Sequence, residues 1–287
     1  ITSPAELLRN PEIDVVFIAS FDDAHRDQVI SALEHGKHVF VEKPLCLTRR
    51  ELEEIADALG EHPELQLSSN FVLRTFPRFI ELRRQIRDGD LGQIYYVEGD
   101  YNYGRLDKLT AGWRGTVENY SVVHGGGIHL IDLLLWLTGE TVQEVFAYGN
   151  QISSEDSQFR SEDLVVSLLK FSNGQVAKVA ANFGSVTPHH HNLAIYGTLG
   201  TFTQSPVGAA YFRSRDPEAI PEQPFGSYPG DKKGEILKSF VGSILDGSQP
   251  DVLAEEVLRA MDVSLGITES LLAGRPVQIN RNNWWWA

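Results

Sequence analysis

Short apolar runs alternate with segments of helical periodicity in the first part of the chain. Residues 13–20 (IDVVFIAS) are mostly apolar at consecutive positions, as in a strand covered on both faces of a parallel sheet. Residues 23–35 carry apolar side chains at helical spacing, and Gly36 ends that segment. Residues 37–41 and 65–70 predict two more strands, with a helix over 49–59 between them. Strands and helices in this order predict βαβ units, and therefore part of a doubly wound parallel sheet.

From Phe71 onward the pattern changes to strands that follow one another. Residues 76–88 and 128–137 predict helices, and residues 94–103 alternate aromatic and polar side chains as a half-exposed strand does. Further strands are predicted over 142–148, 164–171, 175–183 and 191–196, with a hairpin turn at Ser172-Asn173-Gly174. Two helices, 234–246 and 254–272, follow. We therefore expect an α/β unit over 1–70 and an α+β domain with an open, mostly antiparallel sheet over 71–287.

Charge and cysteine content narrow the classes of partner. The 287-residue chain has a formal net charge of −14, which argues against a nucleic-acid backbone or an anionic membrane surface as a partner. No apolar run reaches the ~18–20 residues that span a bilayer. Cys46 is the single cysteine, so an intrachain disulfide is impossible. Together with the lack of a secretory signal pattern, this favours a cytoplasmic location.

The candidate chemistry begins where the strand over 37–41 ends. Glu42-Lys43-Pro44 follows that strand directly and places a carboxylate and an amine at the C-terminal edge of the sheet, where ligands bind in open α/β folds. His129 and Asp132 are three residues apart and share one helix face, so Asp132 could orient the imidazole or contact a substrate. His189-His190-His191 resembles a metal tract, but neighbouring strand residues point to opposite faces, so no metal site is predicted.

The order of motifs resembles the Gfo/Idh/MocA family of NAD- or NADP-dependent sugar and cyclitol oxidoreductases. No single motif is specific, but the ordered set covers essentially the whole chain. The motifs are Ile13-Asp14-Val15-Val16-Phe17-Ile18 followed by His25; Gly36-Lys37-His38-Val39 before Glu42-Lys43-Pro44; Asn70 with Arg74 and Pro77; Leu91-Gly92-Gln93-Ile94; Trp113-Arg114; Gly125-Gly126-Gly127-Ile128-His129-Leu130-Ile131-Asp132; and Gly274-Arg275-Pro276-Val277.

The resemblance implies a Rossmann domain for the cofactor, here only its C-terminal part, over 1–70. It implies substrate binding and assembly into a homo-dimer or homo-tetramer, through the open sheet face, over 71–287. Lys43 and His129 are the implied catalytic residues, which handle the proton of a substrate hydroxyl. The expected cofactor-binding residues are Ser20, Phe21, His25, Glu42, Lys43, Pro44, Asn70, Trp113 and Arg114. The expected substrate-binding residues are Lys43, Arg74, Tyr103, Arg105, His124, His129 and Asp132.

Physical chemistry supports these roles, and for some residues a structural alternative stays open. Oxidation of an alcohol by hydride loss needs a proton acceptor, and a histidine with a pKa near 6.5 is the natural group. A lysine whose pKa is lowered by its surroundings can share that proton. Arg74 could equally form a structural salt bridge. Tyr101, Tyr103 and Arg105 alternate along one strand and either line a pocket or form a packed sheet face.

Two features depart from the family pattern. The G-x-G-x-x-G turn that opens a dinucleotide-binding fold, with its acidic residue ~20 positions later, is absent from this sequence. We expect that the sequence is an incomplete segment; the alternative is a non-catalytic sugar-binding or scaffolding protein that has lost dinucleotide binding. The second departure is Gly125, where many family members carry an aspartate. His124 or Tyr120 could take over part of that role, or His129 acts with Lys43 alone.

Overall fold

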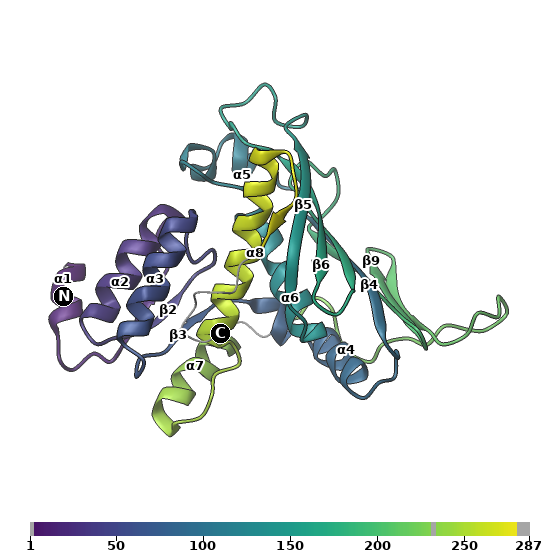
Figure 1. Ribbon diagram of the computed structural model, residues 1–287, viewed down its shortest axis with the longest axis horizontal. Coiled ribbons are helices and arrows are strands. Elements are labelled where there is room, and N and C mark those ends of the chain that lie inside the picture. Colours follow the sequence, from purple (N-terminus) through teal and green to yellow (C-terminus); the bar gives the residue numbers. More distant parts are fainter. Residues whose placement is uncertain (1–2, 231–233, 280–287) are drawn as a thin grey trace.

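The computed structural model describes residues 3–230 and 234–279 and contains two sheets with helices between them (Figure 1). The first sheet is parallel, with strands β1 (Val15–Ile18), β2 (His38–Val41) and β3 (Leu67–Ser69) in that order. Helices α2 (His25–Glu34) and α3 (Arg49–Glu61) connect them, after a short α1 (Pro4–Arg9). The predicted βαβ arrangement is confirmed.

Local chemistry explains why α3 begins where it does. The Thr48 hydroxyl accepts a hydrogen bond from the backbone N–H of Glu51, and the Glu51 carboxylate accepts one from the backbone N–H of Thr48. This capping box satisfies N–H groups that a helix start leaves without partners. It fixes the loop between Pro44 and Leu47, which is buried throughout, and so holds the end of β2 in place.

The second sheet has eight strands in the order β10-β9-β8-β4-β7-β6-β5-β11. Its predicted members are β4 (Ile94–Asn102), β5 (Val142–Asn150), β6 (Leu164–Phe171), β7 (Val176–Asn182) and β8 (His190–Gly197). Three short strands were not predicted: β9 (Thr201–Ser205), β10 (Gly208–Phe212) and β11 (Val277–Gln278). All neighbours are antiparallel except β4 and β7, so the expected open and mostly antiparallel sheet is confirmed.

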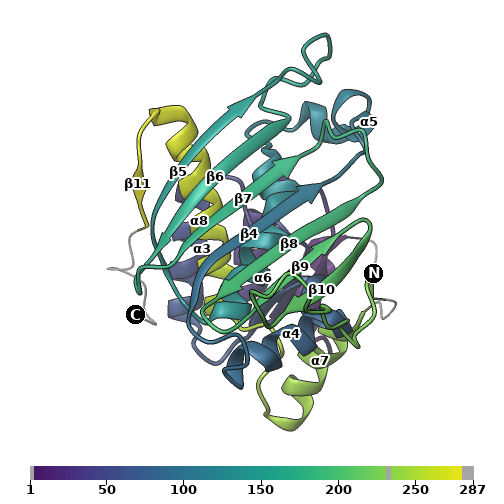
Figure 2. The ribbon, with the colours of Figure 1, turned by 90° about the vertical axis from the view of Figure 1, so that its right-hand side faces the viewer.

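Strand order differs from chain order at two places: β4 lies between β7 and β8, and β11 pairs with β5. The expectation that consecutive strands pair holds for β5, β6 and β7, and residues 172–174 form the predicted turn between the last two. It fails for β7 and β8, because β4 lies between them and pairs parallel with β7 (Figure 2). The aromatic strand β4 is therefore central, and its C-terminal end lies beside those of β7 and the start of β8.

Helices cover one face of this second sheet, and the other face is open in Figure 2. The covering helices are α6 (Ile128–Thr138), which contacts β4, and α8 (Ala254–Ala273), which contacts β5. Helix α8 also contacts α3 and β3, so it packs on both units. For this reason the division of the chain at residue 71 stays a prediction. No helix within residues 3–230 and 234–279 is long and apolar enough to cross a bilayer.

The remaining elements lie around these layers. Helices α4 (Pro77–Arg87) and α7 (Glu235–Asp246) lie near the lower end of the second unit in Figure 1. Short turns are η1 (Asp22–Ala24), η2 (Val72–Thr75), α5 (Asp107–Thr110) and η3 (Trp113–Thr116). A single π-helical turn, η4 (Val123–Gly127), runs directly into α6 and was not predicted. Such turns are rare and are frequently found at functional sites.

Candidate active site

Lys43 joins the two units through one hydrogen bond. It stands at the end of β2 and is linked to Pro44 by a cis peptide bond. Its ammonium donates a hydrogen bond to the carbonyl oxygen of Gly125 in η4, with 2.6 Å between Nζ and the oxygen. The Glu-Lys-Pro segment of the first unit is thereby brought to the turn that precedes His129 and helix α6 in the second.

Burial and neighbouring charges set the protonation of Lys43. Burial lowers the pKa of the Lys43 amine, Asp22 and Glu42 act to raise it, and Arg114 lowers it further. Asp22 is only 8% exposed, and burial raises the pKa of its carboxyl although Lys43 and Arg114 act against this. Asp22 was not among the site residues predicted from the sequence. Its signal was its position, because it follows β1 at the same sheet edge as Glu42.

Other predicted cofactor-binding residues lie at this edge and are connected to one another by hydrogen bonds. The Asn70 amide donates to the Glu42 carboxylate at 2.8 Å. His25 is buried, with Nδ1 at 2.7 Å from the carbonyl oxygen of Pro44 and Nε2 at 3.3 Å from that of Ser20. These contacts connect the ends of all three strands and fix the backbone on either side of Lys43.

Aromatic side chains from both units meet next to this edge. Phe21 is exposed, and its ring lies 4.8 Å from that of Trp113, measured between centroids. The Arg114 guanidinium lies over the Trp113 ring at 4.5 Å. The structure therefore places the predicted Trp-Arg motif of the second unit against the end of β1, on the side where Lys43 and Asp22 also lie within electrostatic range of Arg114.

His129 lies in the first turn of α6. Its ring stacks on Tyr101 of β4 at 6.0 Å, and its Nδ1 is buried without a partner among the described residues. Burial, together with the charges of Lys43, His191 and His189, holds the pKa of His129 well below its usual value. The imidazole is therefore neutral near pH 7 and has a free nitrogen lone pair or N–H to offer.

Asp132 does not orient this imidazole, contrary to the expectation drawn from the spacing. Arg74 binds the Asp132 carboxylate through two nitrogens, at 2.6 Å from Nη2 and 3.0 Å from Nε. Its remaining nitrogen, Nη1, reaches Glu256 at 2.8 Å and the carbonyl oxygen of Asp251 at 3.1 Å. Both Arg74 and Asp132 are buried. The contacts of Arg74 are therefore those of a structural salt bridge, the alternative that the sequence left open.

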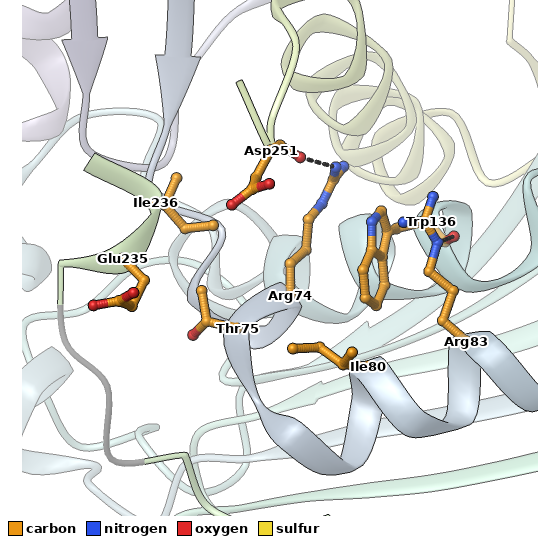
Figure 3. A pocket seen from close by; sticks show the side chains of 8 residues that line it. All are labelled: Arg74, Thr75, Ile80, Arg83, Trp136, Glu235, Ile236 and Asp251. Atoms are coloured by element: carbon orange, nitrogen blue, oxygen red, sulfur yellow. Dashed lines mark hydrogen bonds between the residues drawn. The ribbon is translucent and has the colours of Figure 1, made fainter. Parts of the chain in front are cut away.

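The same arginine lines a cavity of about 340 Å³ (Figure 3). In Figure 3 the indole of Trp136 stands between Arg74 and Arg83, and Arg83 lies 4.2 Å over that ring. The other lining residues are Thr75, Ile80, Glu235, Ile236 and Asp251. Neither Lys43 nor His129 lines this cavity. Arg74 and Asp132 are therefore placed in the packing between η2, α6 and α8, and we leave both out of the proposed substrate site.

His124 is held by a contact with helix α8. It is buried, and its Nδ1 lies 2.7 Å from the Ser264 hydroxyl of α8. Burial lowers the pKa of His124 to about 3, so the ring is neutral. The side chain that does approach Gly125 is Tyr120: a Cβ added to Gly125 would lie 1.9 Å from the Tyr120 hydroxyl oxygen. An aspartate at position 125 has no room in this structure.

Tyr103 and Arg105 lie at the end of β4, beyond Tyr101. The rings of Tyr101 and Tyr103 stack at 5.7 Å, and Arg105 lies 5.2 Å over Tyr103. His189 packs on both tyrosines and His191 on Tyr101. Around His129 the sheet thus contributes a layer of aromatic and imidazole rings. Among the described residues, no group of three or more His, Cys, Asp or Glu side chains could hold a metal ion.

Comparison with protein families gives two adjacent matches. The model described as "Oxidoreductase family, NAD-binding Rossmann fold" matches residues 1–71, and the model described as "GFO/IDH/MocA C-terminal domain" matches residues 79–203. Both describe the same family, and together they span more than half of the chain.

Individual proteins match over nearly the whole length. The chain is 25% identical to scyllo-inositol 2-dehydrogenase (NAD(+)) of Bacillus subtilis, covering 96% of this chain and 81% of that protein. It is 25% identical to 1,5-anhydro-D-fructose reductase of Ensifer adhaerens, covering 97% and 84%. Among solved structures, a levoglucosan dehydrogenase in complex with NADH and L-sorbose has the same fold, with a TM-score of 0.86 at 20% identity over 98% of this chain and 84% of that one.

Proposed function

We propose, since this chain belongs to the Gfo/Idh/MocA family of NAD-binding oxidoreductases, that Lys43 and His129 form its catalytic pair in hydride transfer at a secondary hydroxyl or keto carbon. The substrate class is a sugar, a sugar derivative or a cyclitol, which is the class named for the relatives that match nearly the whole chain. The observation that carries the proposal is the Lys43–Gly125 hydrogen bond, which brings the end of β2 to the turn before His129.

The residues at the sheet edge fit the cofactor end of such a site. Ser20, Glu42 and Asn70 follow the three parallel strands, where ligands bind in this class of fold. The exposed Phe21 ring and the Trp113–Arg114 pair offer an apolar surface and a cation beside them. NAD or NADP, when bound, supplies the hydride acceptor or donor. In this proposal His25 holds the Pro44 backbone rather than contacting the cofactor itself.

Proton handling falls to Lys43 and His129. In the oxidation direction the substrate hydroxyl loses its proton as the carbinol carbon loses a hydride. Both side chains lose their positive charge at a lower pH than they would in water, because burial lowers the pKa of each. A neutral imidazole or amine can accept that proton, and the charged form can return it in the reverse direction. Tyr103 and Arg105, at the end of β4, are proposed to contact the substrate.

The decisive test is the substitution Lys43→Ala. We expect turnover of NAD with a panel of scyllo-inositol, myo-inositol and levoglucosan to fall by a factor of about 10² to 10⁴, the usual contribution of a positioned acid or base. Fluorescence titration should show that the variant still binds NADH. The control is Lys238→Ala in α7, whose exposed ammonium donates a hydrogen bond to the Glu235 carboxylate, far along the chain from the site, and whose loss should not affect turnover. Wild-type turnover in Lys43→Ala would refute the assignment.

The alternative, a non-catalytic sugar-binding or scaffolding protein, has less support. Lys43 and His129 lie on either side of the junction between the two units, and three relatives matched over nearly the whole chain are named as dehydrogenases or reductases. Absence of NADH binding by the complete protein would favour the alternative instead.

We also propose that the protein forms homo-dimers or homo-tetramers through the uncovered face of the second sheet. Exposed apolar residues line that face, among them Tyr148, Val166 and Leu168, which lie on the paired strands β5 and β6. Large exposed apolar patches mark interaction surfaces. A cytoplasmic location is proposed from the single cysteine, which is buried and free, since secreted domains more often use cysteines in pairs.

A further inference from the structure

The last residue of the His189-His190-His191 tract points toward the proposed catalytic pair. His191 lies near the start of β8, directly opposite Tyr101 of β4. Residues paired in this way point to the same face of a sheet. On that face Tyr101 lies against η4, because a Cβ added to Gly126 would lie 2.5 Å from the Tyr101 ring. His191 therefore points toward η4 and α6, where His129 lies.

The His191 ring belongs to the layer of rings around His129. It packs on Tyr101 at 5.2 Å between centroids, and Tyr101 stacks on His129 at 6.0 Å. Burial, Lys43 and then His191 lower the pKa of His129, so the two imidazoles lie within electrostatic range of each other. A second, almost fully buried imidazole is thus part of the proposed substrate site.

The Tyr228 hydroxyl holds His191 in place. The pairing of β9 with β8 stops before it reaches His191. In its place the Tyr228 hydroxyl accepts a hydrogen bond from the backbone N–H of His191 at 3.0 Å and lies 2.7 Å from Nδ1 of the same residue. The Tyr228 ring is itself packed by Phe76, Phe79 and the guanidinium of Arg78, at the start of α4. The hydroxyl therefore has a fixed position beside the imidazole.

The hydrogen bonds of this hydroxyl determine which nitrogen of His191 carries the proton. Burial, with the charges of His189 and His190, lowers the pKa of His191 to about 3, so the ring is neutral near pH 7 and has one N–H. The Tyr228 hydroxyl accepts from the backbone N–H, and the acceptor it can reach among the described residues is Nδ1. A proton on Nδ1 would leave the hydroxyl hydrogen without an acceptor, which is unfavourable in a partly buried place. The proton of the ring is therefore on Nε2.

This Nε2–H is a donor that the described parts of the chain leave unused. The hydrogen bonds of His191 involve Nδ1 and the backbone N–H, which meet Tyr228, and the carbonyl oxygen, which accepts from Gln204. Buried donors in folded proteins nearly always have a partner. Nε2 is at the end of the ring farthest from the strand, on the face that His129 shares. A bound molecule at His129 is therefore the available acceptor.

We propose that His191 is a specificity-determining residue, whose Nε2–H, held in that tautomer by Tyr228, donates a hydrogen bond to a substrate hydroxyl oxygen other than the one that reacts. Tyr228 is then a positioning residue, because it acts through His191. The His191 ring keeps its proton throughout. This inference rests on the proposed function, which places a sugar or cyclitol beside His129.

Two substitutions of His191 separate the two ends of its ring. Asparagine places its amide where Nδ1 lies, and glutamine places its amide where Nε2 lies. We expect His191→Asn to raise the KM for the substrate about tenfold, the contribution of one hydrogen bond, and to change kcat much less, since a non-reacting hydroxyl is bound equally in the ground and transition states. His191→Gln keeps a donor near the substrate, so its KM should lie nearer to the wild-type value.

Monodeoxy derivatives of the substrate identify the contact. For one derivative the wild-type enzyme should lose about tenfold in kcat/KM, whereas His191→Asn should lose no more activity, because its donor is already absent. The matched control is His190→Asn, which lies on the opposite face of β8 and also packs on the Tyr228 ring, at 5.3 Å. It should show the wild-type pattern with every derivative. Additive losses in His191→Asn for every derivative would overturn the inference.

The tautomer is measured without turnover. ¹⁵N NMR of the complete, ligand-free protein labelled with ¹⁵N-histidine shows which ring nitrogen carries the proton, and the His191 signals are those missing in His191→Asn. The wild-type protein should carry it on Nε2, and Tyr228→Phe should move part of it to Nδ1. A wild-type proton on Nδ1 would also overturn the inference.

Failure of the proposed function has a different signature. Calorimetry of substrate binding gives a Kd that needs no turnover, and His191→Asn should weaken that Kd by the same factor as the KM. An unchanged Kd in His191→Asn contradicts the function of His191. Wild-type turnover in Lys43→Ala contradicts the proposed catalytic pair and leaves the binding result standing.

Discussion

At the scale of single residues, the site combines groups that burial keeps neutral. His124 shows the consequence for stability most simply, because burial lowers its pKa to about 3 and no charged group contributes to that shift. In the unfolded chain a histidine has a pKa of about 6.5. The folded state therefore binds fewer protons than the unfolded state between these two values. The stability that His124 contributes is complete above pH 6.5 and is lost as the pH falls toward 3.

We predict that in His124→Gln the free energy of unfolding falls less steeply as the pH is lowered. Each group of this kind changes the free energy of unfolding by up to about 1.4 kcal/mol per pH unit, and a glutamine binds no proton. Urea unfolding at several pH values between 3.5 and 7 should show a slope smaller by about one proton. An unchanged slope in His124→Gln would mean that the ring is charged in the folded protein.

Residue identity and position were enough to place Glu42 and Lys43 after the end of a strand and His129 in the first turn of a helix, and their roles in catalysis and cofactor binding stay predictions. They were not enough for Asp132. Its spacing from His129 was correct for a shared helix face, but the partner that binds its carboxylate, Arg74, comes from η2, a turn that no periodicity announces. Spacing shows which side chains can meet on one helix, and it carries no information about a neighbouring element that competes for them.

At the scale of elements, Arg74 connects three of them. It lies in η2 and binds the carboxylates of Asp132 in α6 and Glu256 in α8. It also donates a hydrogen bond to the carbonyl oxygen of Asp251. Burial opposes its charge, but the two carboxylates outweigh this and raise the pKa of Arg74. Removing one partner of a buried pair leaves an uncompensated charge, which is far more costly than losing a pair at the surface.

Arg74→Met should therefore lower the free energy of unfolding by about 3–5 kcal/mol. The control is Arg84→Met in α4, whose pair with Asp88 is exposed on both sides and should contribute about 0–1 kcal/mol. Guanidinium chloride unfolding of both variants measures the difference. Equal losses of unfolding free energy in the two variants would show that Arg74, Asp132 and Glu256 are solvated.

Most elements could be predicted from the pattern, and those that could not have a common physical reason. The short strands β9, β10 and β11 have too few residues for alternation to stand out. The π turn η4 consists of Val-His-Gly-Gly-Gly, which carries neither a helical face nor a capping residue. The insertion of β4 between β7 and β8 depends on long-range pairing, which no local pattern encodes.

At the scale of the whole molecule, the proposed assembly would use the uncovered sheet face. On β6 the exposed positions Val166 and Leu168 pair across to Tyr148 and Phe146 of β5. We predict that Leu168→Asp gives monomers in sedimentation velocity at micromolar concentration, because a charge in a buried apolar interface has no partner. Leu245→Asp, at an exposed position of α7, should keep the wild-type assembly. A monomeric wild-type protein would refute the proposed interface.

The acceptor that Gly125 offers to Lys43 is a main-chain oxygen, and every amino acid carries one. Substitution at position 125 therefore leaves the chemistry of that contact untouched and is limited by volume alone, because Tyr120 occupies the adjoining space. Positions 120 and 125 must accordingly vary together: a larger residue at 125 becomes tolerable only after the ring at 120 has become smaller. Tolerance at this point of the active site is a property of the two positions jointly, and substitutions tried one at a time would miss it.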